Sequence, residues 1–157
     1  MVYSTSDGEI NVCDFREKSD FSSSPSIRMS TSAENRQSQY SSWLNYISSV
    51  SFLPDPNYLV SREYLNIKMW DLRKQKSVWA AEVNDRFSSD LGTLYRNDAL
   101  DDEFFLATTK DGKHMVTGGY DKSAHVMDLQ ATTNNQIQCK HNQLMGTQAG
   151  KLKVFNR

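Results

Sequence analysis

A repeated segment constrains the fold of this 157-residue chain more than any other feature of its sequence. Each copy combines a short apolar stretch, a pair of Ser, Thr or Gly residues, a polar turn and an alternating stretch that closes on an aspartate. The closing residues Asp14, Asp71 and Asp128 are 57 residues apart, and a partial fourth copy closes on Asn156, 28 residues later. A recurring interval of this kind indicates one structural unit repeated along the chain.

Within each copy, apolar and polar residues alternate with a period of two, which is typical of β-strands. Asp7-Gly8 and Asp111-Gly112 are dipeptides that favour tight turns between such strands. For the second and third copies the predicted strands are Ile47–Leu53, Tyr58–Ser61, Leu65–Asp71, Val78–Val83, Phe104–Thr108, His114–Gly118 and Ser123–Asp128. Small antiparallel sheets repeated in this way predict an all-β fold made of four-stranded WD-repeat β-propeller blades.

Two long insertions explain why the interval exceeds the roughly 40–45 residues of a WD-type unit. In residues 19–42, 10 of the 24 residues are serine, so the segment cannot bury enough apolar surface to offset its ordering entropy. We predict a flexible loop there, with a phosphorylation-controlled contact as the alternative. Residues 84–103 mix acidic with aromatic and aliphatic side chains, which predicts an inter-blade loop with a short amphipathic helix. The predicted blades are 1–18, 43–83 and 104–140, followed by a partial blade at 141–157.

Composition and charge exclude several classes of protein. The chain has 18 Lys and Arg against 19 Asp and Glu, a formal net charge of −1, so no nucleic-acid partner is predicted. Its longest apolar runs are four residues, far short of the ~20 that span a bilayer, so no membrane partner is predicted either. Cys13 and Cys139 are the two cysteines and there is no Asn-x-Ser/Thr sequon, which favours free thiols in the cytoplasm or nucleus.

No catalytic, metal or cofactor signature occurs in the sequence. The three histidines show no paired spacing with each other or with the cysteines, as metal ligands usually do. A Gly-x-Ser-x-Gly elbow, a phosphate loop and a dinucleotide fingerprint are all absent. Trp70 is predicted to pack in its sheet, and Asp14, Asp71 and Asp128 to terminate strands. An enzyme is therefore not predicted.

The second copy carries a resemblance to a known family. Its segment LVSREYLNIKMWDLR, from Leu59, closely resembles the tyrosine-leucine-x-x-lysine-x-tryptophan-aspartate segment of the 55 kDa B-family regulatory subunits of protein phosphatase 2A. Other segments resemble that family in the same order: VYSTSDGEINVCDFR from Val2, ISSVSF from Ile47, LGTLYRNDALDDEFF from Leu91 and MVTGGYDKSAHVMD from Met115. The resemblance is collinear to about residue 131 and weak beyond it.

The resemblance implies a seven-bladed propeller without catalytic activity that joins a catalytic subunit and a helical-repeat scaffold and recruits phosphoprotein substrates. It places substrate contacts on the top face, where the leucine-tyrosine-x-asparagine-aspartate loop matches Tyr95 and Asp98. A nearby aromatic contact of the family falls on Asp101, which is not aromatic. An aromatic ring with a polar tip beside an acid suits recognition of basic segments. The alternative is that Tyr95 packs the loop down and Asp98 caps a helical turn.

The chain encodes about three of the seven blades that the resemblance implies, starting at the second strand of one of them. A propeller covers its strand edges by closing into a ring, so an incomplete ring is expected to leave open edges at Met1–Thr5 and near the C-terminus. We therefore expect a fragment or truncated form of a longer subunit that folds poorly alone. Three functions remain open: part of a phosphatase regulatory subunit, a generic WD-repeat interaction scaffold, and a non-functional truncation.

Overall fold

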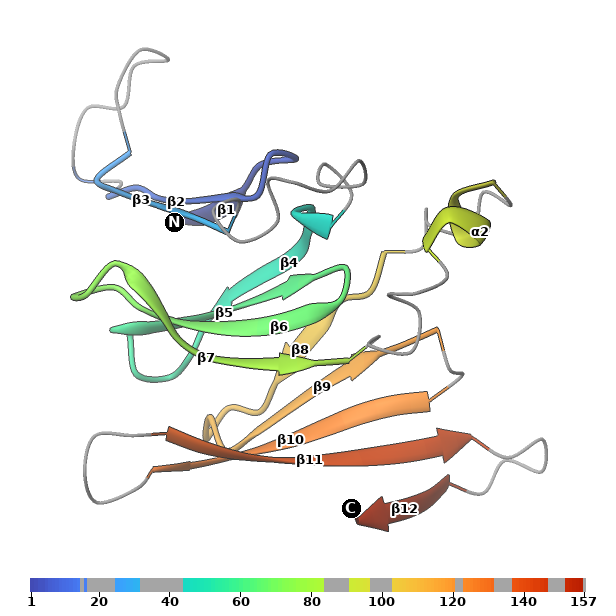
Figure 1. Ribbon diagram of the computed structural model, residues 1–157. Coiled ribbons are helices and arrows are strands. Elements are labelled where there is room, and N and C mark those ends of the chain that lie inside the picture. The colour runs from blue at the N-terminus through green and yellow to red at the C-terminus, as the bar shows by residue number, and fades with distance from the viewer. Residues whose placement is uncertain are drawn as a thin grey trace.

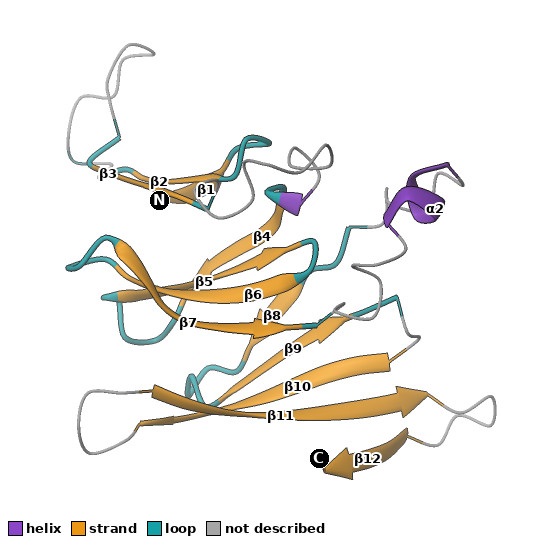
Figure 2. Cartoon of the chain, in the orientation of Figure 1, coloured by secondary structure: helices purple, strands orange, loops and turns teal. Residues whose placement is uncertain are grey.

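Three antiparallel β-sheets pack face to face, in the order in which they occur in the sequence (Figures 1 and 2). The computed structural model describes residues 1–14, 16, 25–31, 44–83, 91–96, 103–120, 123–131, 137–146 and 152–156. In each sheet the strands pair with their neighbours in the chain, so each sheet is an antiparallel meander. Consecutive meanders packed face to face have the architecture of β-propeller blades, which confirms the predicted fold class.

The three sheets differ in strand number. Sheet 1 contains β1 (Val2–Ser4), β2 (Glu9–Val12) and β3 (Ile27–Ser30). Sheet 2 contains β4 (Ile47–Phe52), β5 (Tyr58–Glu63), β6 (Asn66–Asp71) and β7 (Lys76–Glu82). Sheet 3 contains β8 (Leu106–Thr108), β9 (His114–Gly118), β10 (Ser123–Ala131), β11 (Ile137–Gly146) and β12 (Leu152–Asn156). A helix, α2 (Leu91–Arg96), lies between sheets 2 and 3 in the sequence, within the range where a short helix was predicted.

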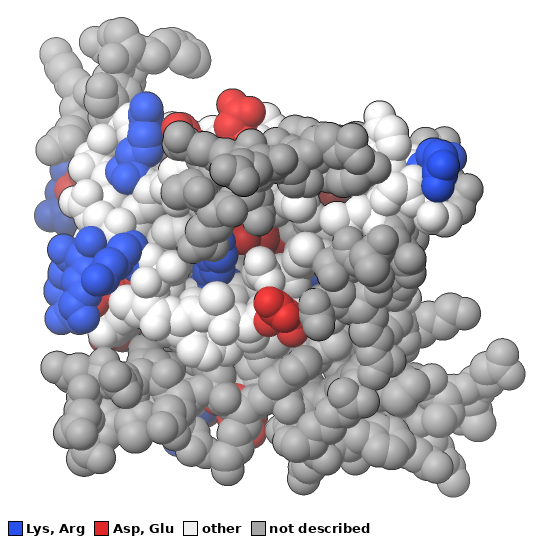
Figure 3. Space-filling model, in the orientation of Figure 1, with Lys and Arg blue, Asp and Glu red and all other residues white. Residues whose placement is uncertain are grey.

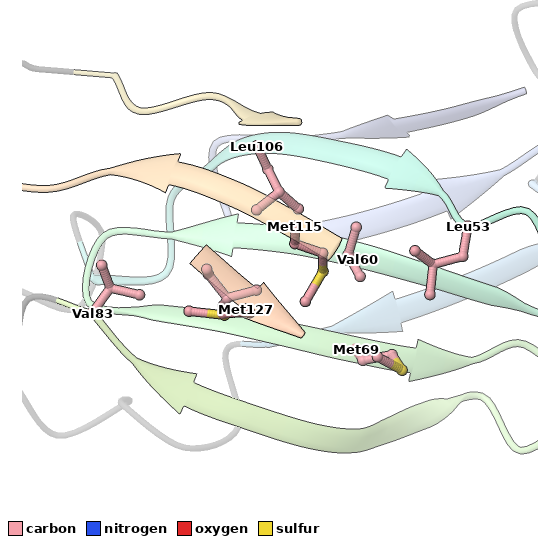
Figure 4. Packing of buried hydrophobic residues seen from close by; sticks show 8 residues of the cluster. Leu53, Val60, Met69, Val83, Leu106, Met115 and Met127 are labelled. Atoms are coloured by element: carbon pink, nitrogen blue, oxygen red, sulfur yellow. The ribbon is translucent and has the colours of Figure 1, made fainter. Parts of the chain in front are cut away.

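Alternation along the strands of sheet 2 explains how one sheet packs against two neighbours. Leu59 and Trp70 belong to a buried cluster with Ile10 and Met29 of sheet 1. Their strand neighbours point to the opposite face, where Val60 of β5 and Met69 of β6 join apolar side chains of sheet 3 (Figure 4). Sheet 2 is therefore the central layer, with an apolar core on each side.

The interface between sheets 1 and 2 also contains polar pairs. Trp70 Nε1 donates a hydrogen bond of 2.8 Å to Ser61 Oγ, and Ser61 is fully buried. Lys68 Nζ lies 3.2 Å from Glu63 Oε2, with 3% and 1% of these side chains exposed. Alternation places all four residues on the face of sheet 2 that meets sheet 1. The prediction that Trp70 packs inside its sheet is thus confirmed, and its indole N–H has a buried partner.

The predicted flexible loop over residues 19–42 is wrong for Ile27–Ser30, which form β3. Ile27 pairs with Val12 of β2 and Met29 with Ile10. Met29 is 3% exposed and belongs to the cluster between sheets 1 and 2. Two apolar positions in alternation are enough to attach a short edge strand, although serines surround it in the sequence. Residues 19–24 and 32–42 lie outside the described residues.

The predicted boundary between a blade at 104–140 and a partial blade at 141–157 is also wrong. It falls inside β11, and β12 pairs with β11 in the same five-stranded sheet. Asp128 does not terminate a strand either, because β10 continues to Ala131 and pairs with β11 along its whole length. Backbone hydrogen bonds between two long strands do not depend on the polar side chains that suggested a boundary here.

Asp71 does end its strand, and its side chain organises the turn that follows. The carboxylate accepts hydrogen bonds from the Arg73 backbone N–H at 2.9 Å, Nε at 3.2 Å and Nη2 at 3.2 Å. The side-chain hydrogen bond from Arg73 holds the pKa of Asp71 below its ordinary value of 3.8. The ionised form is therefore favoured in the folded state.

This depressed pKa predicts a pH dependence of stability. The ionised carboxylate stabilises the fold fully above the unfolded pKa of 3.8, and that contribution is lost as the pH falls through the lower folded pKa. We expect Asp71→Asn to flatten the acid side of the stability curve, measured as urea midpoints from neutral pH to about pH 2. The matched control is Glu82→Gln, which removes an exposed carboxylate and should leave the slope unchanged. Equal slopes for wild type and Asp71→Asn would contradict the prediction.

Candidate protein-interaction site

Helix α2 and two neighbouring segments meet at one end of the sheet stack, on the right in Figure 1. Leu91 of α2 and Leu44, just before β4, are 8% and 7% exposed and form a small apolar cluster. Tyr64 and Leu65 of the β5–β6 turn pack against it. Helix α2 is thus anchored through Leu91 at the end of sheet 2.

Of the three residues predicted for the site, the structure describes one. Tyr95 lies on α2 and is 47% exposed, so its ring is displayed at this end of the stack rather than packed into the core. Asp98 and Asp101 lie outside the described residues. The placement of Tyr95 beside an anchored leucine is compatible with a binding role, and the roles of Asp98 and Asp101 stay predictions.

A tyrosine–glutamate pair lies at the same end and was missed by the sequence analysis. Tyr46 OH donates a hydrogen bond of 2.6 Å to Glu103 Oε1, and Tyr46 is 36% exposed. The hydrogen bond raises the pKa of Tyr46 above its ordinary value, because ionisation would remove the donated proton. The two residues are 57 residues apart, which is the repeat interval, and they lie one residue before β4 and three residues before β8, respectively. That spacing is the one feature of the sequence that links the two residues.

An aromatic cluster lies next to this end of the stack, between sheets 2 and 3. The Tyr120 ring lies 4.9 Å from Phe104 in an edge-on arrangement and 5.5 Å from Tyr64, measured between centroids. The Arg62 guanidinium carbon lies 5.6 Å from the centroid of Phe104. The rings come from the β5–β6 turn, the entry to β8 and the end of β9, so they tie sheet 2 to sheet 3.

Arg62 is a fully buried residue of this supporting layer. Its Nη1 donates to the backbone carbonyls of Glu63, Tyr64 and Asn66, and its Nε donates to Thr117 Oγ1 at 3.3 Å. Burial lowers the pKa of Arg62 to about 10, so the guanidinium remains charged at neutral pH. These contacts close the β5–β6 turn and join it to sheet 3, which is a structural role.

The described groups at this end suit recognition rather than catalysis. Tyrosine side chains combine apolar area with a hydroxyl, and Glu103 adds a carboxylate. Among the described residues, no group of three or more His, Cys, Asp or Glu could hold a metal ion. The described helices include none that is long and apolar enough to cross a membrane. Arg96 in the last turn of α2 adds an exposed guanidinium at this end, and a larger group of Lys and Arg side chains lies around the β6–β7 turn on the left of Figure 3.

Comparison with known proteins identifies relatives but no matching family model. The regulatory subunit phr2AB of protein phosphatase 2A from Dictyostelium discoideum is 30% identical over 129 residues, 82% of this chain and 27% of the relative. The regulatory subunit sur-6 from Caenorhabditis elegans is 32% identical over 121 residues, 76% of this chain and 24% of the relative. Over most of its length the chain is thus similar to regulatory subunits of protein phosphatase 2A. This confirms the resemblance seen in its motifs.

The similarity extends to subunits named for their 55 kDa mass. The B beta isoform from Carassius auratus is 30% identical over 82% of this chain and 29% of its own length. The chain thus spans about a quarter of the length of the curated relatives that it matches. Among solved structures, the β-propeller domain of Cps50 (Swd1) from Myceliophteria thermophila superposes on 85% of this chain and 36% of that domain, with a TM-score of 0.48 and 12% identity.

Proposed function

We propose that this chain forms part of a regulatory subunit of protein phosphatase 2A and catalyses no reaction itself. The observation that carries the proposal is the similarity over 76–82% of the chain to proteins named as regulatory subunits of that phosphatase. The phosphatase catalytic subunit and its helical-repeat scaffold are the proposed partners, in the cytoplasm or nucleus. The surface around α2, where a tyrosine and a glutamate are displayed, would present phosphoprotein substrates with basic segments.

Direct binding to the phosphatase core tests this proposal. The tagged 157-residue chain is mixed with purified catalytic and scaffold subunits, and the complex is separated by size-exclusion chromatography. We expect the chain to elute with at least one of the two subunits. Elution apart from both would contradict the proposal and favour the alternative, a WD-repeat interaction scaffold unconnected with the phosphatase.

Tyr95→Ala tests the surface around α2. We expect about a tenfold weaker affinity for a basic phosphopeptide substrate, because an aromatic contact contributes on the order of 1–2 kcal/mol to an interface. The melting temperature should stay close to that of the wild type, since Tyr95 is 47% exposed. Affinity is measured by fluorescence anisotropy on the chain assembled with the phosphatase core.

Tyr3→Ala is the matched control for that experiment. Tyr3 is 40% exposed but lies on β1 of sheet 1, away from α2. The control should retain wild-type affinity. Equal losses in both variants, or no loss in Tyr95→Ala, would remove Tyr95 from the proposed surface.

A further inference from the structure

The β6–β7 turn concentrates positive charge at the end of the sheet stack that lies opposite α2 (Figure 1). Arg73, Lys74 and Lys76 are all exposed there, and Figure 3 shows Lys and Arg side chains gathered at this place. The turn projects from sheet 2, the central layer, which has a described sheet packed on each of its faces. We call these three residues the basic turn.

The hairpin holds its cations in a defined arrangement. Asp71 and Lys76 pair across it, and Gln75 closes it in the left-handed conformation with a φ of 52°. The Arg73 guanidinium carbon lies 5.6 Å from the centroid of the Tyr58 ring, and Arg73 Nη2 donates a hydrogen bond of 3.0 Å to Tyr58 OH. Arg73 is therefore restrained although 60% of its side chain is exposed, so little conformational entropy is lost when a partner binds it.

The acid that belongs to this turn does not neutralise its surface. The Asp71 side chain is 1% exposed, so one buried carboxylate stands against three exposed cations. Lys74 Nζ approaches that carboxylate only to 3.8 Å. Asp55 of the β4–β5 turn also acts electrostatically on Arg73, and its Oδ1 accepts two hydrogen bonds from Asn57. Two positive charges of the basic turn thus remain uncompensated by Asp71.

The exposed arginines of sheet 1 differ in this respect. Arg16 Nε lies 3.4 Å from Asp14 Oδ1, and Arg28 Nε lies 3.9 Å from Glu9 Oε2. The side chains of these two acids are 46% and 35% exposed, so both signs of charge are accessible in each pair. Only an excess of one sign attracts a partner of the opposite sign, and the basic turn has such an excess.

The geometry of Arg73 indicates which kind of anion fits. Its Nε and Nη2 both donate to the Asp71 carboxylate at 3.2 Å, so this edge of the guanidinium is not available for a two-pronged grip on a single phosphate. The lysines contribute ammonium groups, which act as point charges without a preferred plane. Positive charge spread over three residues in this way suits a run of carboxylates better than one phosphate.

We propose that the basic turn docks an acidic segment of a partner protein, a stretch of successive Asp and Glu residues. The carboxylates of this segment lie along Arg73, Lys74 and Lys76 and replace the water that covers these side chains. The surface around α2 is at the other end of the stack, so both surfaces can be occupied at once. This docking does not depend on association with the phosphatase.

Fluorescence anisotropy with a labelled peptide, a run of glutamates flanked by glycines, tests the proposal on the 157-residue chain. We expect saturable binding at low salt that weakens at about 0.15 M salt, because salt screens exposed charges. Lys74→Glu/Lys76→Glu should lower the affinity at least about tenfold, since two attractive charges become repulsive. Lys74→Gln/Lys76→Gln should act in the same direction and serves if the first variant fails to fold by circular dichroism.

Lys110→Glu/Lys113→Glu is the matched control. It reverses two exposed lysines of the β8–β9 turn, which also carries the exposed Asp111, and changes the net charge by the same amount. The control should retain wild-type affinity. Absence of peptide binding, unchanged affinity in the variants of Lys74 and Lys76, or an equal loss in the control would overturn the proposal. Binding of phosphatidylserine vesicles or of a peptide with a single phosphoserine, without binding of the glutamate peptide, would also overturn it.

Discussion

Replacement of Lys68 by methionine is expected to lower the free energy of unfolding by about 3–5 kcal/mol. Lys68 and Glu63 form an ion pair of 3.2 Å between Nζ and Oε2, and their side chains are only 3% and 1% exposed. Methionine matches the volume of lysine but removes the ammonium group that lies 3.2 Å from the buried Glu63 carboxylate. The cost therefore comes from the charge that remains, not from lost packing. Urea denaturation followed by circular dichroism measures it.

The double variant Glu63→Gln/Lys68→Met separates charge from packing. It removes both charges at nearly constant volume, so more than half of the lost stability should return. Lys74→Met is the control, because Lys74 is 57% exposed and also approaches a carboxylate, that of Asp71, at 3.8 Å. Exposed pairs contribute at most about 1 kcal/mol. A loss below that value in Lys68→Met would show that the pair is not desolvated as the structure describes.

Trp70→Ala is expected to lower the free energy of unfolding by about 3–5 kcal/mol, as much as Lys68→Met, because it opens a cavity in the core between sheets 1 and 2. Trp70 is 3% exposed and packs in one cluster with Ile10, Met29, Ile47 and Leu59. Sheet 1 has three short strands, so its attachment depends strongly on this core. We expect the variant to lose protection of the β2 and β3 amides in hydrogen exchange as well as global stability.

Trp70→Phe distinguishes the volume of the ring from its hydrogen bond. Phenylalanine retains most of the buried area but leaves Ser61 Oγ without the indole N–H that lies 2.8 Å away. A loss of about 1–3 kcal/mol is expected. Adding Ser61→Ala should return part of it, since the unpaired hydroxyl is then removed. Val78→Ala, at a 40% exposed edge position, should change stability by no more than about 0.5 kcal/mol. If Trp70→Ala behaved like Val78→Ala, the described core would be wrong.

The candidate site was predictable only in part. The exposed aromatic residue Tyr95 followed from the resemblance of its loop, and the structure places it on a short helix. The Tyr46–Glu103 pair was not recognised, because two residues so far apart give no local pattern. Their separation of 57 residues acquires meaning only when sheets 2 and 3 pack against each other and bring the starts of β4 and β8 close together.

The end of β5, from Ser61 to Glu63, was not predicted correctly from the sequence. Its polar residues predicted a strand end at Ser61 and a turn after it, yet β5 continues to Glu63. Arg62 and Glu63 are 0% and 1% exposed. Charged residues in a sequence indicate a solvated turn unless their partners are known. Here Glu63 pairs with Lys68 of the neighbouring strand. Arg62 donates to Thr117 of sheet 3 and to backbone carbonyls of the β5–β6 turn and β6.

The sequence by itself predicted the repeating unit, the approximate positions of the four strands of sheet 2 and the resemblance to phosphatase regulatory subunits, because alternation and recurring motifs are properties of neighbouring residues. Only the tertiary structure decided that β10, β11 and β12 share one sheet, that Ile27–Ser30 joins sheet 1, and that Arg62, Glu63 and Lys68 are buried. The reason is that strand pairing and desolvation depend on groups brought together from distant parts of the chain, whose contribution no local pattern records.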